Sequence, residues 1–219
     1  MGGPAPGDHR SDVPQVLKAD VRRRIVGAGE DVFFERGFDG ATMTDIARRA
    51  DVGAASIYRY FPDKEALFEA VVPDELIAEH DRLLDERIAA LVEPVDTSPT
   101  AGALLDFWVA HHRAVAMLLD HSGSTSRSAY ARAFVARLSD HVVATLDRPP
   151  TTDGRAVLDL VFDNTRRALS TILRATGDDA RLRVLIAGFW SYQLPGLDGL
   201  VGWLGDVTPA AAPRRRTRR

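Results

Sequence analysis

The side chains best suited to chemistry in this chain lie between residues 42 and 64. They are small residues, hydroxyls and cations, the types that contact nucleic acids. Hydroxyl, lysine and arginine donors bind phosphates, and short or forked side chains on an exposed helix read base edges in the major groove. The candidates for such contacts are Thr42, Thr44, Ala54, Ala55, Ser56, Tyr58, Arg59, Tyr60 and Lys64.

The types and positions of several candidates suggest individual roles. Thr42 and Thr44 stand at the start of a predicted helix, where free backbone N–H groups favour an anion. Ala54 and Ala55 allow close approach and can touch a thymine methyl group, while Arg59 can fork onto guanine or grip a phosphate.

Two short helices joined by a tight turn would position these residues. Thr42 caps the first helix, with Asp45 three residues later as in a capping box. Asp51 stands where the chain must reverse, and aspartate tolerates the left-handed region better than most residues. Gly53 leads into a second helix over residues 54–60. The pattern predicts a helix-turn-helix, the unit that places a helix in the DNA major groove.

The remainder of the chain also reads as helical. Apolar residues recur at three- and four-residue steps over 12–38, where Gly37 offers a left-handed stop. Helical spacing returns after a proline-containing loop at 93–100, and we expect a break at Leu194-Pro195-Gly196 in the last helix. No strand alternation is convincing, so the predicted fold class is all-α.

Thirteen positions together resemble the N-terminal signature of the TetR family of transcriptional repressors. The similarity covers residues 21–71, and it departs from the usual pattern at Asp51, where glycine is common, and at Gly53, where serine is common. The positions that carry the resemblance are Phe38, Thr42, Ile46, Ala47, Ala50, Val52, Ser56, Ile57, Tyr58, Tyr60, Phe61, Lys64 and Leu67.

The resemblance implies further roles in DNA binding. Tyr58 would donate its hydroxyl to a phosphate, and Lys64 would pair with another phosphate at the start of the next helix. The alternatives are that Tyr58 and Tyr60 pack between helices and that Lys64 is a solvated charge. Arg48 and Arg49 fit a solvated face better than DNA contacts, whereas residues 22–24, three arginines, fit phosphates and a solvated face equally well.

The resemblance also implies a domain organisation. We expect a disordered arm at 1–14, a three-helix DNA-binding domain at 15–72, a helical domain for ligand binding and dimerisation at 73–206, and a disordered basic tail at 207–219. Helices over 155–176 and 178–194 would form the seam of a homodimer.

The resemblance implies that the helices of the second domain enclose a pocket for a small, partly apolar effector. Ligand sites have apolar walls with a few polar groups, which guides the choice of candidates. Candidate effector-binding residues are Phe107, Trp108, His111, His112, Met117, Phe134, Phe162 and Trp190. Each aromatic residue at helical spacing can equally be part of the core.

Composition limits the other classes of function. Hydrophobic residues are 45% and charged residues 27%, which is ordinary for a globular protein, and there is no cysteine to form a disulfide or a thiolate metal site. The net charge is −3, so DNA binding must depend on local placement of charge. The most apolar late stretch is interrupted by polar residues and proline, so we expect no membrane span and a cytoplasmic protein.

The expected function is a ligand-responsive repressor that binds a near-palindromic DNA operator as a homodimer, without cofactor, metal or enzymatic activity. Two alternatives stay open. One is an all-α metal-dependent hydrolase that uses His111 and His112, although adjacent histidines point about 100° apart on a helix. The other is a dimeric small-molecule binding module without DNA binding, for which the low basicity argues.

Overall fold

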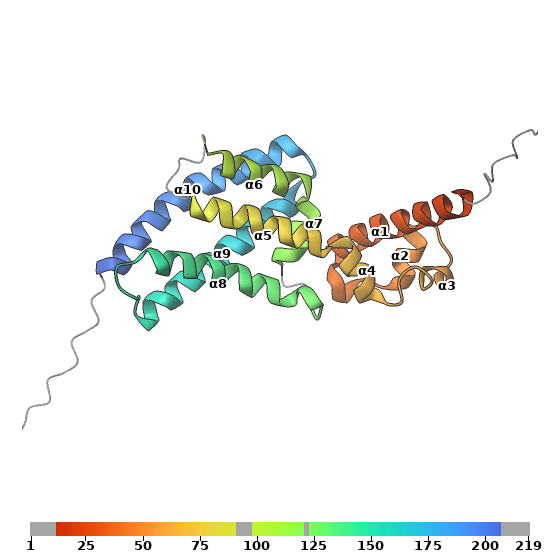
Figure 1. Cartoon of the computed structure of the whole chain (residues 1–219), viewed down its shortest axis with the longest axis horizontal. Coiled ribbons are helices and arrows are strands. Elements are labelled where there is room, and N and C mark those ends of the chain that lie inside the picture. Colours follow the sequence, from red (N-terminus) through yellow and green to blue (C-terminus); the bar gives the residue numbers. More distant parts are fainter. Residues whose placement is uncertain (1–11, 91–97, 121–122, 207–219) are drawn as a thin grey trace, which may run out of the picture. The chain divides into compact units, whose positions relative to one another are not determined.

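The computed structural model describes residues 12–90, 98–120 and 123–206, with the side chains of 12–16 and 206 left undescribed. All regular structure in these ranges is helical, which confirms the predicted all-α class (Figure 1). The α-helices are, in chain order, α1 (Asp12–Gly40), α2 (Met43–Arg49), α3 (Ala54–Ile57), α4 (Lys64–Val71), α5 (Asp74–Ala89), α6 (Pro99–Ala110), α7 (His112–Leu119), α8 (Tyr130–Thr145), α9 (Thr152–Ala175) and α10 (Asp179–Asp206), and a 3-10 turn precedes α8 at Ser126–Ala129.

The chain divides into two compact units. The first comprises Met1–Ile77 together with Ser122–Ser126, and the second comprises Ala78–His121 and Arg127–Arg219. The short later segment is tied into the first unit by polar contacts: the Ser126 N–H donates to Glu65 Oε1 (2.7 Å) and the Ser124 hydroxyl donates to Asp39 Oδ1 (3.1 Å). The predicted basic tail lies outside the described residues, and α1 begins at Asp12, within the predicted N-terminal arm.

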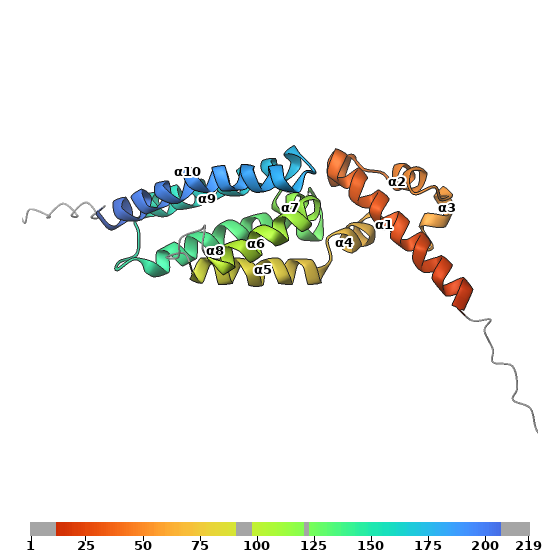
Figure 2. The same ribbon diagram turned by 90° about the horizontal axis from the view of Figure 1, so that it is seen from above.

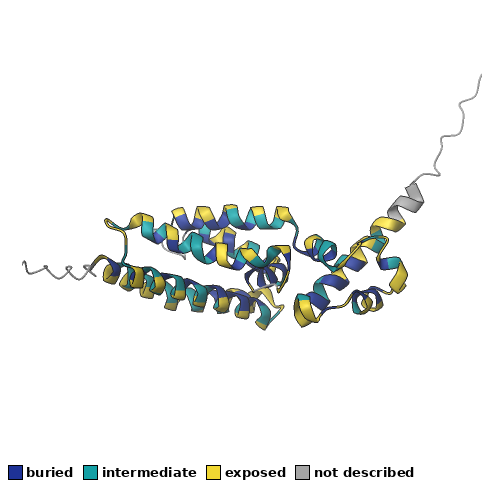
Figure 3. Ribbon diagram, turned by 90° about the horizontal axis from the view of Figure 1, so that it is seen from below, coloured by how far each residue is buried: buried dark blue, intermediate teal, exposed yellow. Residues whose placement is uncertain are grey.

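The first unit is organised around one face of α1. Its buried residues Ile25, Val32 and Phe33 recur at helical spacing, and α1 packs against α2 and α4. Phe33 meets Phe68 of α4 edge to face, with ring centroids 5.1 Å apart. Figure 3 shows buried residues on the inward sides of these helices and exposed residues on their outer sides. The long first helix therefore serves as the support for the two short helices that follow it.

The predicted turn chemistry is present in the first unit. Gly37 leaves helical geometry, with φ 70° and ψ 171°, at the predicted glycine position, and it kinks α1 three residues before the helix ends at Gly40. Thr42 caps α2 by accepting the Asp45 N–H (3.1 Å), and Gly53 is the extended N-cap of α3. Asp51 has φ 52° and is the only non-glycine residue of the described ranges in the left-handed region. The reversal between α2 and α3 thus uses the residues that the sequence indicated.

In the second unit, α7 is the most buried helix, because every residue from 114 to 119 is buried. It packs against α8 and α9, and α9 also packs against α10 (Figure 2). Arg166 of α9 reaches into this core at 1% exposure, where Nη1 donates to the Leu119 carbonyl (2.5 Å) and Nη2 pairs with Asp163 (2.6 Å). A buried guanidinium is tolerated there because its charge is paired and its donors are used.

Two details of the second unit differ from the sequence expectation. The helical run over 99–119 is divided at His111, whose φ −117° and ψ 27° end α6 and begin α7. The break expected at Leu194-Pro195-Gly196 is absent, because α10 continues through Pro195. Proline removes one backbone donor, but Pro195 and Ser191, four residues earlier, are both exposed, so water can satisfy the carbonyl that loses its partner.

The left-handed Asp51 predicts an asymmetric response to substitution. Asp51→Val should lower the free energy of unfolding by about 1–2 kcal/mol, because a β-branched side chain strains a positive-φ position, while Asp51→Gly should not lower it. Urea denaturation of the three proteins tests this. Equal stability of the valine and glycine variants would show that the turn relaxes to accept a branched residue.

Candidate nucleic-acid interface and effector cavity

The orientation of α3 is set by two buried residues on its inner side. Ile57 is 0% exposed and Phe61, just after the helix, is 3% exposed. Their burial turns Tyr58, at 54% exposure, and Arg59 outward. Ala54 and Ala55 at the start of α3 are also exposed. α3 is shorter than the predicted helix over 54–60, and the small, aromatic and basic candidates lie on the solvent side of α3 and of the turn that follows it, as a groove-reading surface needs.

The hydroxyl groups at the start of α2 and within α3 differ in what they contact. Thr42 is held in its cap, since its hydroxyl accepts the Asp45 N–H and donates to Asp45 Oδ2 (2.8 Å). Thr44 is exposed, and Ser56 accepts a hydrogen bond from Arg59 Nη2 (3.2 Å). Thr42 thus supports the N-terminus of α2, while Thr44 is presented to solvent.

Carboxylates neutralise most of the arginines around α2. Asp45 accepts hydrogen bonds from Arg36 (2.9 Å) and Arg48 (2.6 Å), and Arg49 pairs with both Asp31 (3.1 Å) and Glu35 (2.9 Å). The Thr42 hydroxyl, followed by the charges of the two arginines, holds the pKa of Asp45 below its ordinary value despite some desolvation. These arginines are committed to intramolecular pairs, which fits the prediction of a solvated face for Arg48 and Arg49.

Lys64 has a structural role in addition to the predicted phosphate contact. Its ammonium donates to the carbonyls of Phe38 (2.7 Å) and Ala41 (3.0 Å), and it lies 4.3 Å from the centre of the Phe38 ring. Lys64 thereby joins the N-terminus of α4 to the turn between α1 and α2. An ammonium has three donors, so one remains for a phosphate.

The family model for "Bacterial regulatory proteins, tetR family" matches residues 25–71, the stretch that contains most of α1 and all of α2, α3 and α4. Residues 25–71 are therefore similar to the N-terminal domain of the TetR family. The predicted signature, residues 21–71, and the matched region nearly coincide, and the exposed residues of α3 lie within both.

Curated relatives from the TetR family match mainly through this region. The chain is 33% identical over 66 residues to the transcriptional repressor NemR of Escherichia coli K12, covering 30% of the chain and 33% of the relative. It is 35% identical over 94 residues to the regulator BetI of Cronobacter sakazakii, covering 42% and 44%, and 35% identical over 81 residues to the repressor DhaR of a Mycobacterium species, covering 36% and 40%. The chain therefore matches less than half the length of each of these proteins.

The second unit is also found in known structures at the level of fold. The transcriptional regulatory protein RHA5900 aligns over 86% of this chain and 100% of its own, with TM-score 0.51 and 22% identity. This likeness establishes the all-helical arrangement and nothing about ligands. In the described ranges, no helix is both long and apolar enough to span a membrane.

A cavity of about 90 Å³ lies inside the second unit between α5, α6, α8, α9 and α10. Its walls are mostly leucine and tryptophan, with three polar groups. Gln193 donates to the Thr165 hydroxyl (2.9 Å), and Arg87 donates to the Ala90 carbonyl (2.8 Å). The lining residues are Leu84, Arg87, Ile88, Leu104, Trp108, Phe134, Leu138, Thr165, Leu169, Trp190, Gln193, Leu194 and Leu197.

Of the eight predicted effector-binding residues, Trp108, Phe134 and Trp190 line this cavity. The other five lie elsewhere: Phe162 packs in a core with Leu158 and Val142, and Met117 is buried in α7. His111 is exposed beside the Phe107 ring, and His112 lies 2.9 Å from the Leu173 carbonyl. The sequence does not identify the polar lining residues Arg87, Thr165 and Gln193 as part of the cavity. No local pattern shows which polar residue of a helix faces apolar side chains from other helices.

A hydrogen-bonded relay runs from the cavity wall into the surrounding helices. The Trp108 indole donates to His80 Nε2 (2.9 Å), so the neutral imidazole carries its proton on Nδ1, which faces the Tyr130 hydroxyl (2.5 Å). Tyr130 donates to Asp81 (2.6 Å), which also pairs with Arg137 (2.5 Å). Burial lowers the pKa of His80 to about 4, against the smaller opposing effect of Asp81.

Substitution of Lys64 should lower stability and DNA affinity through two different contacts, so the two losses can be measured separately. Lys64→Met keeps the stem but removes the donors to two carbonyls, so the free energy of unfolding should fall by about 1–2 kcal/mol. If the third donor contacts a phosphate, the slope of log affinity against log salt should also flatten by about one unit. Denaturation and salt titration measure the two effects. A stability loss with an unchanged slope would limit Lys64 to its structural role.

His80 predicts a stability that depends on pH. The folded state holds His80 neutral down to a pKa of about 4, while the unfolded chain protonates it near 6.5, so the unfolded state binds more protons between these values. The stabilisation that comes from keeping His80 neutral is fully present above pH 6.5. The free energy of unfolding falls by about 2 kcal/mol on going from pH 7.5 to 5.0. His80→Gln should lose about 2 kcal/mol less than the wild type over this range.

The matched control is His111→Gln, which removes an exposed imidazole and leaves the His80 relay in place. It should retain the wild-type loss. If urea denaturation gives the same difference between pH 7.5 and 5.0 in all three proteins, the buried histidine does not control the acid response.

Proposed function

We propose that this protein is a ligand-responsive transcriptional repressor that binds a near-palindromic DNA operator as a homodimer. The observation that carries the proposal is the outward presentation of Tyr58 and Arg59 directly after α3, where the neighbouring Ile57 and Phe61 are buried. That helix lies in the region matched by the TetR family model, and the relatives NemR and DhaR are named as transcriptional repressors.

DNA recognition in this proposal divides between two kinds of contact. Arg59 and the alanines of α3 read base edges, while Tyr58, Thr44 and the remaining donor of Lys64 bind phosphates. One α3 helix covers only half of an operator. Two copies related by two-fold symmetry place their recognition helices about 34–36 Å apart, one turn of the duplex.

The surface of α9 and α10 supports dimerisation. Large apolar side chains are exposed there, among them Leu160 (61%), Val184 (70%) and Tyr192 (76%). Each would be covered by a second copy, and a self-complementary patch of this kind is what a two-fold interface uses. These helices correspond to the seam predicted from the sequence.

The cavity in the second unit supports a role as effector site. Its volume of about 90 Å³ is below the range of about 300–1,000 Å³ typical of ligand pockets. An effector of ordinary size therefore fits only if the helices that line the cavity move apart. An effector that prefers the widened arrangement shifts the population towards it, and DNA is released if that arrangement no longer matches the operator spacing. In this proposal the protein acts in the cytoplasm and catalyses no reaction.

The metal-hydrolase alternative receives no support from the histidines in the described ranges. No group of three or more histidine, aspartate or glutamate side chains there is placed to hold a metal ion. His80 is committed to the Trp108–Tyr130 relay, while His111 and His112 contact different neighbours.

The proposed function can be tested by selection from sheared genomic DNA of the organism that encodes the chain. We expect retained fragments to share one near-palindromic sequence, and sedimentation to show an even number of chains on each bound duplex. Retention of fragments without a common sequence, or one chain per duplex, would overturn the proposal.

Substitutions of Tyr58 and Arg59, the outward residues directly after α3, should change DNA binding in different ways. Arg59→Ala should relax the preference at one operator position by about 1–3 kcal/mol if its guanidinium reads a guanine. Tyr58→Phe should weaken binding to all duplexes alike, because only a phosphate contact is lost. Repeating the selection with each variant gives the measurement, and an equal loss on all sequences for Arg59→Ala would reassign Arg59 to the backbone.

A further inference from the structure

The cations of the first unit fall into two groups according to their partners. Arg23, Arg36, Arg48 and Arg49 each pair with a carboxylate, as in the Arg23–Asp20 pair on α1. Among the ion pairs of the described residues, none includes Lys18, Arg22 or Arg59. A cation whose charge is neutralised within the protein attracts a phosphate less than one whose charge is not.

Five described cations of the first unit take part in no ion pair, and three of them line one groove; the five are Lys18, Arg22, Arg24, Arg59 and Lys64. Lys18 and Arg22 come from α1, and Arg59 and Tyr60 come from the turn that follows α3. The groove has a volume of about 660 Å³, and its lining residues, Lys18, Ala19, Arg22, Arg59 and Tyr60, include no carboxylate. The groove thus adjoins the recognition helix and carries a local positive charge, although the chain as a whole has a net charge of −3.

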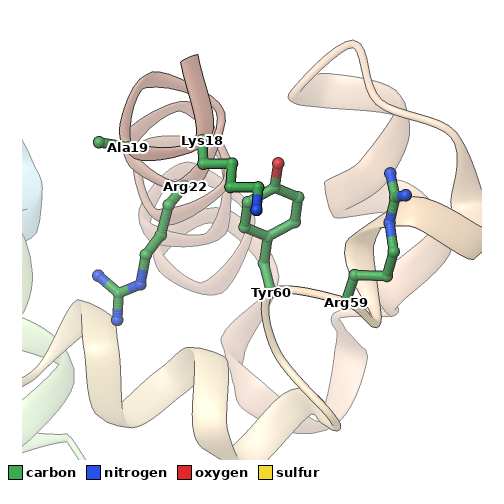
Figure 4. Close-up of a pocket in the computed structure, with 5 residues that line it drawn as sticks. All are labelled: Lys18, Ala19, Arg22, Arg59 and Tyr60. Carbon is green, nitrogen blue, oxygen red and sulfur yellow. The ribbon is translucent and has the colours of Figure 1, made fainter. Parts of the chain in front are cut away.

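The side chains of the groove are held from behind by the hydrophobic core. The Arg22 guanidinium lies 5.0 Å from the centre of the Phe61 ring, and Phe61 is itself buried. Arg59 donates to Ser56 (3.2 Å). Figure 4 shows the Tyr60 ring in the middle of the groove with Lys18 beside it, while the guanidinium groups of Arg22 and Arg59 point to opposite sides.

This spread of charge identifies the kind of anion that fits. A single phosphate ion is bound best when donors converge on one point, whereas these donors are distributed along a strip. A nucleic-acid strand carries one phosphate about every 3.4 Å along the helix axis, so consecutive phosphates can meet separate cations. An extended polyanion therefore uses the groove more fully than an isolated ion does.

From these observations we infer that Lys18 and Arg22, in the groove that they share with Arg59 and Tyr60, are further DNA contacts, which hold the phosphate backbone next to the segment read by α3. The inference rests on the proposed function, since it requires a DNA-binding protein. It adds α1 to the DNA contacts. Because phosphates are the same in every sequence, Lys18 and Arg22 contribute affinity and register without base preference, while Arg59 at the edge of the groove reads bases.

The test compares two double variants that remove the same total charge. Lys18→Gln with Arg22→Gln removes two groove cations, and Arg23→Gln with Arg48→Gln removes two cations that are paired with carboxylates. Affinity is measured against salt concentration on two duplexes, a fragment that the wild type retains from genomic DNA and an unrelated fragment of equal length. Thermal denaturation checks that each variant is folded.

The groove variant should flatten the slope of log affinity against log salt by about two units, on both duplexes, because each lost phosphate contact is worth about 0.9 unit. The paired-cation variant should change the slope by less than half as much. Lys18→Arg with Arg22→Lys should keep the wild-type slope. Ethylation of the phosphates flanking the α3 contact should interfere with binding by the wild type and not by the groove variant.

Equal slopes in the two double variants, or no change in either, would overturn the inference while leaving the repressor proposal intact, provided that the wild type binds its selected fragment. A wild type that binds neither duplex at low salt would overturn both. The two failures are therefore distinguishable from the wild-type titration alone.

Discussion

The surface that we propose to contact DNA depends on the burial of Ile57. The helix α3 is only four residues long, and an isolated helix of that length has no stability of its own in water. Its position comes from Ile57 and Phe61, both buried against the first unit, and from the left-handed Asp51, which reverses the chain after α2. Ile57 and Phe61 point into the core on either side of Tyr58 and Arg59. The side chains of Tyr58 and Arg59 therefore point to solvent. So short a helix can present a fixed surface because the surrounding core holds it in place.

Charge in the first unit is sorted by its partners. Carboxylates on α1 and α2 neutralise Arg36, Arg48 and Arg49, while Lys64 satisfies the carbonyls at the end of α1. Three cations without an ion pair, Lys18, Arg22 and Arg59, lie between α1 and the turn after α3. A protein with a net negative charge can in this way present a cationic surface to a duplex, because field strength near a surface depends on the closest charges.

The second unit combines a well-packed centre with a small internal space. Residues 114–119 of α7 are all buried, and Arg166 is bound to the Leu119 carbonyl and to Asp163, so a movement here would expose apolar surface and break these contacts. The cavity beside Trp108 is lined by helices that leave a small space between them. Trp108 links it to the hydrogen-bonded relay, because its indole donates to His80. A ligand that wedges these helices apart must alter the relay geometry as well, because Trp108 belongs to both. Packing density therefore determines where the unit can yield and where it cannot.

The sequence by itself determined the features that depend on neighbours within a few residues. These are the all-α class, the Thr42 cap and the positive φ values of Asp51 and Gly37, since each follows from local sterics and hydrogen bonding. Tertiary structure decided which of the predicted aromatic residues line the cavity, which carbonyls Lys64 binds, and that α10 continues through Pro195. The partners in those contacts are distant along the chain, or depend on which side of a helix faces solvent. A side chain's own type and spacing cannot specify them, because the same pattern is compatible with core, cavity or surface until the helices pack.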